Sequence, residues 1–297
     1  MYSGFAIIKI QGGLGNQLFQ YVFGKYMQKY FNYKLLFFYP GSEETPGPMA
    51  RACQLQYLCN VPVITGWRAQ ALNMASLSRI SAAALAKTKV VGVYSDCEKN
   101  CIVLPEHRQF DKPYLFRLIS VFRGSWHNLP ASLDILDDVK IQITSCLQNL
   151  LATKSHLDSI DYGSLLANSV ILHVRIGDSH DKLSSDYYQR AFDALNAKHP
   201  IPAESKIYFI SDQPRKAEKM LAFLGKSLIE LPFDDPLLAM SALAMARYKI
   251  LSHSTFSLWG ALLSNRGSNS IYPLMQSTPS PWWDELEALQ GVNLIKV

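Results

Sequence analysis

The chain has 297 residues, of which 48% are hydrophobic and 18% are charged, and this composition excludes a disordered or fibrous protein. Its length leaves room for two buried cores rather than one. The 29 Lys and Arg exceed the 24 Asp and Glu by five, which is too small and too scattered an excess for a protein that coats nucleic acid. The charge is compatible with a local site for phosphate.

The five cysteines show none of the paired spacings of a structural zinc site. An odd and scattered set of this kind favours reduced thiols and a cytoplasmic location. Residues 1–13 resemble a strand and a glycine turn rather than a signal peptide, so export is not expected. No apolar run reaches the roughly 18 residues that cross a bilayer, so membrane contact is expected only as a peripheral one, at the inner face of the cytoplasmic membrane.

The N-terminal segment predicts a strand, a glycine turn and a helix. Residues 5–10 form a short apolar run, and apolar residues recur at helical spacing over 14–26. Residues 35–39 favour a second strand, and the segment 40–48 is so rich in proline and glycine that it favours a surface loop. Between residues 50 and 150 the pattern is weaker, and the elements expected there are a helix at 76–86 and a strand at 90–94.

The C-terminal half shows repeated strand and helix units. The strands are apolar, which indicates burial on both faces, and Pro214 and Pro236 open two of the helices. Ser254 and Thr255 are suitable N-cap residues for the last helix. Such repeats predict a parallel sheet covered on both faces. The expected strands are 170–174, 207–210, 249–251 and 271–272, and the expected helices are 214–224, 236–247 and 256–263.

Both halves therefore begin with the same order of strand, turn and helix. This predicts an α/β protein with two Rossmann-like domains that face a cleft. We expect residues 1–155 to form an N-terminal Rossmann-like domain and residues 156–297 to form a C-terminal Rossmann-like domain.

The first candidate site is the glycine turn at residues 11–17. Glycines between a strand and a helix let the backbone approach a ligand closely, which makes Gly13, Gly15 and Asn16 candidates for binding. As a dinucleotide fingerprint the turn is poor, because Leu18 stands where the third glycine belongs. A plain tight turn with a helix cap is the alternative.

The second candidate site follows the strand 170–174. Ligands of open α/β sheets bind beyond the carboxyl ends of the strands, and an arginine there can fork two hydrogen bonds onto a phosphate. Arg175 is therefore the strongest single candidate, with a surface ion pair to Asp178 or Asp181 as the alternative. His173 could be a buried structural histidine, and Asp178 could be a helix cap in a loop.

Two further sites lie at other strand ends. Asp212 could accept hydrogen bonds from a guanine edge or a ribose hydroxyl, or it could cap the helix that opens at Pro214. The amides and hydroxyls of residues 253–257, at a helix start, could bind phosphate, or they could simply cap the helix.

Together, these motifs resemble the α-1,2-fucosyltransferases of glycosyltransferase family 11. The resemblance implies a GT-B fold, GDP-fucose as donor, inversion at the anomeric carbon and no requirement for a metal. It also implies a hexosyltransferase that adds fucose to the 2-hydroxyl of a terminal galactose during synthesis of a surface glycan such as the O-antigen of lipopolysaccharide. The segments that carry the resemblance are 12–21, 173–178, 187–188, 209–212 and 254–260.

The resemblance also implies roles for individual residues. The domain 1–155 would lie on the acceptor side, and the domain 156–297 would bind the nucleotide sugar. Arg175 would hold the donor diphosphate, and Asp212 would lie near the nucleoside. Transfer with inversion needs a base for the acceptor hydroxyl, for which Asp178 is our choice. The complete expected sets are Arg175, Asp178 and Asn16 for catalysis, and Gly13, Gly15, Asn16, His173, Arg175, Asp212, Ser254, Thr255 and Phe256 for donor binding.

The chain also departs from the family pattern. Ile176 stands where the family usually carries a second arginine, and His253 stands where it usually carries asparagine. Two alternatives follow: a nucleotide-sugar-binding protein that has lost catalysis, or an NAD-dependent oxidoreductase that uses the glycine turn. The missing third glycine argues against the oxidoreductase.

Overall fold

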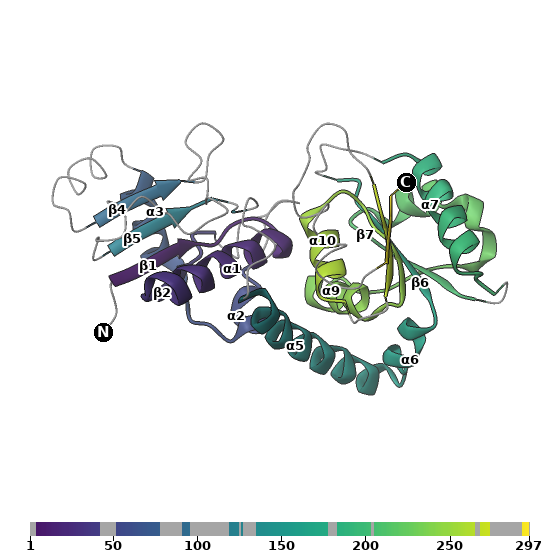
Figure 1. The fold of residues 1–297 in the computed structure, drawn as a ribbon, viewed down its shortest axis with the longest axis horizontal. Coiled ribbons are helices and arrows are strands. Elements are labelled where there is room, and N and C mark those ends of the chain that lie inside the picture. Colours follow the sequence, from purple (N-terminus) through teal and green to yellow (C-terminus); the bar gives the residue numbers. More distant parts are fainter. Residues whose placement is uncertain are drawn as a thin grey trace. The chain divides into compact units, whose positions relative to one another are not determined.

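Two compact units make up the chain, Met1–Val139 and Lys140–Val297, and each contains one parallel β-sheet (Figure 1). The division falls inside the long helix α5, whereas the sequence analysis placed the domain boundary near the end of that helix, between residues 155 and 156. In this computed structural model the described residues are 4–41, 52–77, 91–95, 119–124, 126, 135–177, 183–202, 205–264, 268–273 and 293–296.

The N-terminal unit is built on a five-stranded sheet with the order β3-β2-β1-β5-β4, in which neighbouring strands are parallel. Strand β1 lies at the centre of the sheet because its apolar run is buried. The elements of this unit are β1 (Gly4–Lys9), α1 (Leu14–Phe31), β2 (Tyr33–Phe38), α2 (Leu55–Cys59), β3 (Val63–Ile64), α3 (Gly66–Leu77), β4 (Val91–Ser95) and β5 (Ile119–Arg123).

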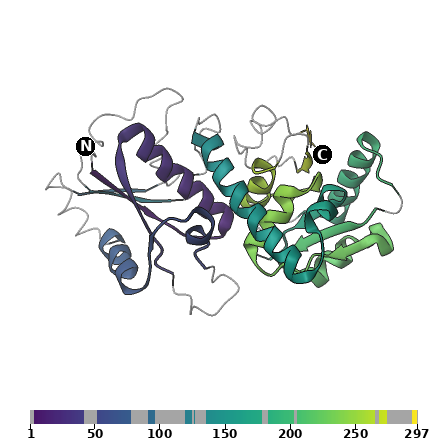
Figure 2. The same cartoon turned by 90° about the horizontal axis from the view of Figure 1, so that it is seen from below.

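Helices cover both faces of this sheet (Figure 2). On one face, Ala69 of α3 packs in a cluster with Ile7 and Val121 of the central strands. On the other face, Phe23 of α1 meets the Phe122 ring edge to face at 5.1 Å between centroids. Neighbouring residues of a strand point to opposite faces, so strand β5 contacts both helices through adjacent side chains.

The C-terminal unit is built on a six-stranded parallel sheet with the order β11-β10-β9-β6-β7-β8. All five residues of β6 are buried, as expected for a central strand that helices cover on both faces. Helix α5 (Ile135–Asp158) begins in the N-terminal unit and continues into this one. The other elements of this unit are α6 (Tyr162–Ala167), β6 (Val170–Val174), α7 (Ser185–Lys198), β7 (Ile207–Ser211), α8 (Pro214–Met220), a 3-10 turn (Ala222–Ser227), β8 (Leu228–Glu230), α9 (Pro236–Met245), β9 (Tyr248–Ile250), α10 (Thr255–Leu262), β10 (Asn269–Tyr272) and β11 (Asn293–Lys296).

The apolar core of this unit lies between the sheet and helices α7 and α8. It joins Leu172 of β6 and Phe209 of β7 to Tyr188 of α7 and Leu221, all of which are buried. Helices α9 and α10 lie on the opposite face of the sheet, and they pack so closely that a Cβ at Gly260 would come 2.8 Å from Leu243 (Figure 1).

Several local predictions are confirmed. Pro214 and Pro236 each stand in the first turn of a helix, and the Ser254 hydroxyl accepts a hydrogen bond from a backbone amide in the first turn of α10. Helix α3 ends at Leu77, and the remainder of the helix expected at 76–86 lies outside the described residues. Helix α5 was not expected, although Val139, Ile143, Leu147 and Leu151 mark a buried stripe along it at four-residue spacing.

Two observations bear on chemistry and location. Of the five cysteines, Cys53, Cys59 and Cys146 are described, and all three are free thiols. Within the described ranges, no helix combines the length and apolar character that a membrane crossing requires.

Candidate functional site

Three loops meet at the carboxyl edge of the C-terminal sheet, after the neighbouring strands β9, β6 and β7. The sheet order makes them adjacent although they are far apart in the sequence. They carry His173 and Arg175 after β6, Asp212 after β7, and Ser254, Thr255 and Phe256 after β9. Ligands of open parallel sheets bind at this edge, so the predicted residues of the C-terminal unit gather where binding is expected.

Asp212 holds the loop that follows β6. Its Oδ1 accepts a hydrogen bond from the Ile176 amide at 3.0 Å, and its Oδ2 accepts one from the Gly177 amide at 2.9 Å. The same Oδ2 lies 3.0 Å from Nη1 of Arg175. A Cβ at Gly177 would stand 2.6 Å from that oxygen, so a larger residue there would require the Asp212 carboxylate to shift.

These contacts settle one of the alternatives considered for the sequence and show one partner of Arg175. The N-cap of α8 is Gln213, so the interpretation of Asp212 as that cap is wrong. Arg175 pairs with Asp212, while Asp178 and Asp181, the partners considered earlier, lie outside the described residues. The two paired side chains are 19% and 22% exposed, so they are within reach of solvent and of a ligand.

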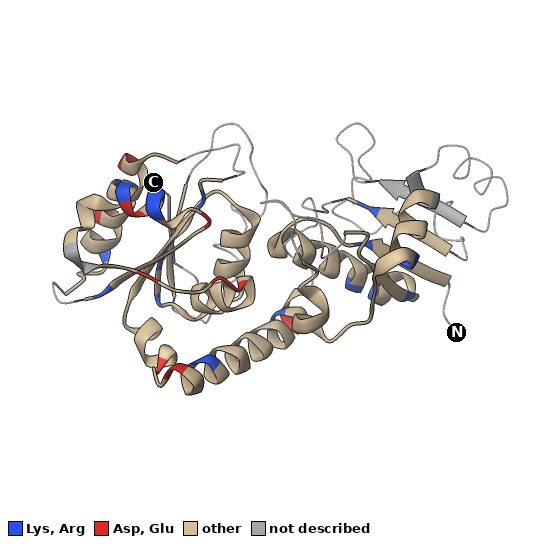
Figure 3. Ribbon diagram, turned by 180° about the vertical axis from the view of Figure 1, so that it is seen from behind, with Lys and Arg blue, Asp and Glu red and all other residues tan. Residues whose placement is uncertain are grey.

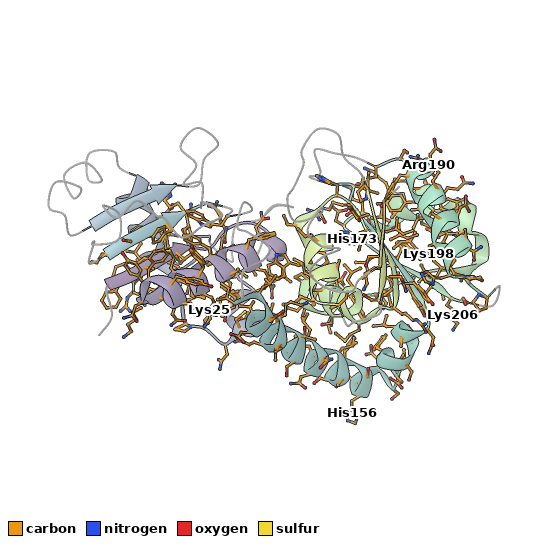
Figure 4. The ribbon with its side chains drawn as sticks, viewed as in Figure 1. Lys25, His156, His173, Arg190, Lys198 and Lys206 are labelled. Carbon is orange, nitrogen blue, oxygen red and sulfur yellow. The ribbon has the colours of Figure 1, made fainter. Side chains whose placement is uncertain are left out.

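His173 is a buried histidine held by two serine hydroxyls (Figure 4). Its Nδ1 lies 2.7 Å from Ser252 Oγ and 2.6 Å from Ser257 Oγ, and its ring stacks on Phe256 at 5.2 Å between centroids. Burial lowers the pKa of His173 to about 4, assisted by the positive charge of Arg175 and opposed by Asp212. The imidazole is therefore neutral near pH 7, so Arg175 rather than His173 provides positive charge at this edge.

A cluster of hydroxyls leads from His173 into the start of α10. Ser254 Oγ accepts a hydrogen bond from the Ser257 amide at 3.1 Å and lies 3.2 Å from the Ser257 hydroxyl. Ser254 therefore caps α10, as one alternative of the sequence analysis predicted. Residues 253–256 are partly exposed, whereas Ser257 and the helix beyond it are buried. The residues that lead into α10 are therefore partly accessible at the same edge as Arg175.

Two tyrosines of α7 form hydrogen bonds to the backbone at the carboxyl ends of β9 and β6. The Tyr187 hydroxyl donates to the Leu251 carbonyl at 2.7 Å, and the Tyr188 hydroxyl donates to the His173 carbonyl at 3.1 Å. Both hydrogen bonds are buried. The pair belongs to the motifs that carry the family resemblance, but sequence reasoning gave it no role. The structure shows that it fixes the backbone from which His173 and Arg175 project.

Ile176, which replaces the second arginine of the family pattern, packs its side chain against the apolar core on the α7 face. Only its backbone amide takes part in the loop, through the hydrogen bond to Asp212. An isoleucine fits this position because its surroundings are apolar. The substitution therefore removes a cation without leaving a gap in the polar edge.

The glycine turn of the N-terminal unit is held by two glutamines. Gln17 donates to the Gly12 and Ala52 carbonyls, both at 3.0 Å, and accepts from the Gln54 amide at 2.9 Å. Gly12 has a φ of +77°, and a Cβ there would meet the Asn16 side chain at 2.7 Å.

Gln20 performs the same task one turn later. It donates to the Gln11 carbonyl at 3.3 Å and to the Gly124 carbonyl at 3.0 Å, and it accepts from the Gln11 amide at 2.9 Å. Both glutamines are 0% exposed, and sequence reasoning missed them. The available signal was the position of the two glutamines among apolar residues in the first two turns of the helix, because a buried amide side chain needs hydrogen-bond partners.

The predicted residues thus fall into two groups. Gly13, Gly15 and Asn16 lie at the start of α1 in the N-terminal unit, whereas the others that are described lie at the carboxyl edge of the C-terminal sheet. Asp178 lies outside the described residues. Across the ranges that the structure describes, His, Cys, Asp and Glu form no group of three that could hold a metal ion.

No family model and no curated protein matches the sequence. The fold is similar to that of NodZ α-1,6-fucosyltransferase soaked with GDP-fucose, with a TM-score of 0.51, 13% identity and coverage of 89% of this chain and 93% of that chain. A second NodZ structure, from Bradyrhizobium, gives a TM-score of 0.51 at 14% identity, covering 90% of this chain and 94% of that chain.

POFUT1 in complex with GDP gives a TM-score of 0.50 at 10% identity, covering 92% of this chain and 98% of that chain. Identities this low establish likeness of fold alone. These structural neighbours are GT-B glycosyltransferases, and the predicted α/β class with two parallel sheets is confirmed.

Proposed function

We propose that this protein is an inverting fucosyltransferase that takes fucose from GDP-fucose without a metal ion. The observation that carries the proposal is the position of Arg175, which Asp212 holds at the sheet edge where the partly exposed start of α10 also lies. This combination of a guanidinium and helix-end amides suits a diphosphate. The structural neighbours named for GDP or GDP-fucose support the choice of nucleotide sugar.

Arg175 is assigned to the leaving group. When GDP departs from the sugar, negative charge builds on the diphosphate, and a fixed cation stabilises that charge more in the transition state than in the ground state. Engagement of Nη1 by Asp212 fixes the plane of the guanidinium. A guanidinium has five N–H donors, so this ion pair is compatible with a fork onto phosphate oxygens.

The start of α10 is assigned to the same diphosphate. The first amides of a helix have no carbonyl partner within the helix, and the helix dipole favours an anion there. Ser254 and Thr255 place hydroxyls at this end, and Phe256 stacks on the neutral His173. Asp212 lies at the same edge, where the family resemblance places the nucleoside. Both of its carboxylate oxygens, however, already accept hydrogen bonds from the loop after β6. We therefore assign Asp212 to holding that loop.

The acceptor is assigned to the N-terminal unit, with Gly13, Gly15 and Asn16 near the sugar. We propose a terminal galactose as acceptor and its 2-hydroxyl as the attacking group, in the synthesis of a lipopolysaccharide O-antigen or another surface glycan. These finer statements are supported by the motif resemblance. Asp178 is the proposed base for the hydroxyl proton.

Calorimetry with nucleotides tests the donor assignment. We expect GDP to bind at least tenfold more tightly than GMP, because Arg175 and the start of α10 address the second phosphate. Equal affinities for GDP and GMP would show that the diphosphate site is misplaced. Tight binding of NADH without GDP binding would instead favour the oxidoreductase alternative.

A product assay tests catalysis. The protein is incubated with GDP-fucose and a panel of galactose-terminated oligosaccharides, and products are detected by mass spectrometry and their linkage by NMR. Transfer to the 2-hydroxyl supports the full proposal. Binding of GDP-fucose with no product from any acceptor would favour the non-catalytic alternative, which rests on the loss of the second arginine at Ile176.

A further inference from the structure

His173 points to the face of the C-terminal sheet that α10 covers. Leu172 and Val174, its neighbours along β6, pack into the core on the α7 face, and adjacent residues of a strand point to opposite faces. The contact of the His173 ring with Ser257 of α10 agrees with this direction. Arg175 follows two residues later, and after burial its positive charge is the second cause that lowers the pKa of His173. The ring therefore lies near the guanidinium that is assigned to the diphosphate.

The segment that contacts Nδ1 of His173 carries no charged side chain. Residues 251–264 contain no Lys, Arg, Asp or Glu, and the ribbon of α10 is tan throughout (Figure 3). In many sites a carboxylate or a carbonyl selects which ring nitrogen of a histidine carries the hydrogen. Here the partners of Nδ1 are two hydroxyls, and a hydroxyl can donate or accept. The tautomer therefore depends on how the other neighbours use these hydroxyls.

The lone pairs of Ser257 Oγ are occupied by other donors. The Ser252 amide donates to this oxygen at 3.3 Å, and the Ser254 hydroxyl donates to it at 3.2 Å. A serine hydroxyl accepts two hydrogen bonds and donates one. Ser257 keeps its own hydrogen for a remaining neighbour, and Nδ1 at 2.6 Å is closer than Ser252 Oγ at 3.0 Å. Nδ1 is then the acceptor, and the single hydrogen of the neutral ring lies on Nε2.

Ser252 meets Nδ1 from a second direction. Its Oγ lies 2.7 Å from Nδ1, which is closer than its 3.4 Å from Ser254 Oγ. Ser252 and Ser257 are 1% and 0% exposed, so solvent does not compete for either hydroxyl. If the ring flipped, it would give up hydrogen bonds to two buried groups, which is costly. The two serines therefore fix both the orientation and the tautomer of the ring.

The other ring nitrogen, Nε2, is left for a ligand. In the part of the chain that the structure describes, no group forms a hydrogen bond with it. His173 keeps 5% of its surface exposed, and Nε2 is not among the fully enclosed polar atoms that lack a partner. Stacking on Phe256 fixes the plane of the ring. A hydrogen-bond donor that is held in one direction beforehand suits an oxygen on which negative charge develops.

We propose that Ser252 and Ser257 are positioning residues, which hold His173 in the Nε2–H tautomer so that Nε2 donates a hydrogen bond to a phosphate oxygen of the nucleotide sugar. The inference rests on the proposed function, because that function places the diphosphate beside Arg175. Arg175 supplies positive charge to the diphosphate, whereas His173 supplies a directional hydrogen bond without a charge. The two side chains thus have different tasks at one edge of the sheet.

The first test observes the tautomer and needs no catalysis. The histidine rings of the full chain are labelled with ¹⁵N, and the His173 signals are assigned from their absence in His173→Phe. Long-range ¹H–¹⁵N spectra at neutral pH distinguish a ring nitrogen that carries a hydrogen from one that does not. We expect the hydrogen on Nε2 and none on Nδ1. Saturating GDP should shift the Nε2 signal more than the Nδ1 signal.

The second test removes the hydroxyls one at a time. Ser257→Ala should populate both tautomers of His173 and weaken GDP binding about tenfold, as the loss of one hydrogen bond predicts. Ser252→Ala should have a smaller effect, because Ser257 still donates to Nδ1. The matched control is Ser241→Ala on α9, whose equally buried hydroxyl donates to the Leu237 carbonyl at 2.7 Å. This control should leave the tautomer and the GDP affinity unchanged.

A double-mutant cycle shows whether Ser257 acts through His173. His173→Phe removes the ring nitrogens and keeps a planar ring against Phe256. In that background, Ser257→Ala should weaken GDP binding no further. Additive losses of GDP affinity would mean that Ser257 acts through the start of α10 alone, and they would overturn its role as a positioning residue. Thermal unfolding of each variant ensures that folded proteins are compared.

The outcomes separate this inference from the proposed function. A hydrogen on Nδ1 in the free protein overturns the inference, whatever the protein binds. GDP binding in calorimetry with both His173 signals unmoved overturns the contact to phosphate and leaves the fucosyltransferase intact. An Nε2–H tautomer that Ser257→Ala disturbs, in a protein that binds no GDP, supports the role of the serines and contradicts the proposed function.

Discussion

Arg175 is the residue on which the proposed chemistry depends. In Arg175→Ala, kcat should fall by about 10²-fold or more, while the affinity for GDP-fucose falls less, because the charge on the diphosphate grows as the glycosidic bond breaks. Arg175→Lys should recover little, since an ammonium cannot reproduce the planar fork. Single-turnover kinetics together with calorimetry measure the two effects separately.

Thermal unfolding is the control for this variant. Arg175 and Asp212 are both partly exposed, so the loss of their ion pair should cost no more than about 1 kcal/mol. A folded Arg175→Ala protein with wild-type kcat would show that the leaving group is stabilised elsewhere.

Lys249 is a fully buried lysine in the middle of β9. Its Nζ donates to Ser264 Oγ at 2.5 Å, and burial lowers its pKa from 10.5 to about 7. Between about pH 7 and pH 10.5 the unfolded chain holds this proton and the folded chain does not. The free energy of unfolding should therefore rise with pH across this window and reach its low plateau below about pH 7.

Lys249→Met should abolish this pH dependence and stabilise the fold at pH 7 by about 2 kcal/mol. The reason is that folding of the variant no longer has to bury an amine that is charged in the unfolded chain. Ser264 keeps a partner, because its hydroxyl also donates to the Gly260 carbonyl. Urea unfolding at pH 6, 7.5 and 9 measures the effect. The matched control is Lys206→Met, at an exposed position of the same unit (Figure 4), and an unchanged pH slope in Lys249→Met would contradict the prediction.

At the scale of elements, the first two turns of α1 hold the loops of the N-terminal unit. Gln20→Leu leaves the Gln11 amide and the Gly124 carbonyl without their buried partner, which should cost about 1–3 kcal/mol of unfolding free energy. The Gln11 amide should also exchange its hydrogen faster. Denaturant unfolding and hydrogen exchange measured by NMR test both effects.

Gln28→Leu is the control on the same helix, because Gln28 is partly exposed and, within the described part of the chain, its side-chain oxygen accepts a hydrogen bond from Lys25 alone. Its unfolding free energy should change by less than about 0.5 kcal/mol. Equal losses in the two variants would mean that the cost arises from leucine in the helix and not from the loops.

At the scale of the whole molecule, the proposed reaction needs no metal ion. In this proposal, Arg175 and the start of α10 supply the positive charge that a metal would otherwise provide. Turnover in excess EDTA should equal that in its absence. A tenfold loss in EDTA, reversed by magnesium or manganese, would reject the metal-free assignment.

The sequence by itself determined the local elements of this protein. The prolines at 214 and 236, the cap at Ser254 and the apolar strand Val170–Val174 were all predicted correctly, because propensity, capping and burial pattern act over a few residues. These repeated units also specified the parallel α/β class. Arg175 was placed at a strand end by the same reasoning.

Only the tertiary structure decided which side chains meet. Asp212 bonds the Ile176 amide 36 residues away, His173 bonds Ser257 84 residues away, and Gln20 bonds Gly124 across 104 residues. Such pairs follow from the order of strands in the sheet, which no local pattern encodes. The residue type determines which hydrogen bonds a side chain can form, and this can be read from the sequence. The fold determines the partner, because a buried polar group must bond the groups that packing brings within reach.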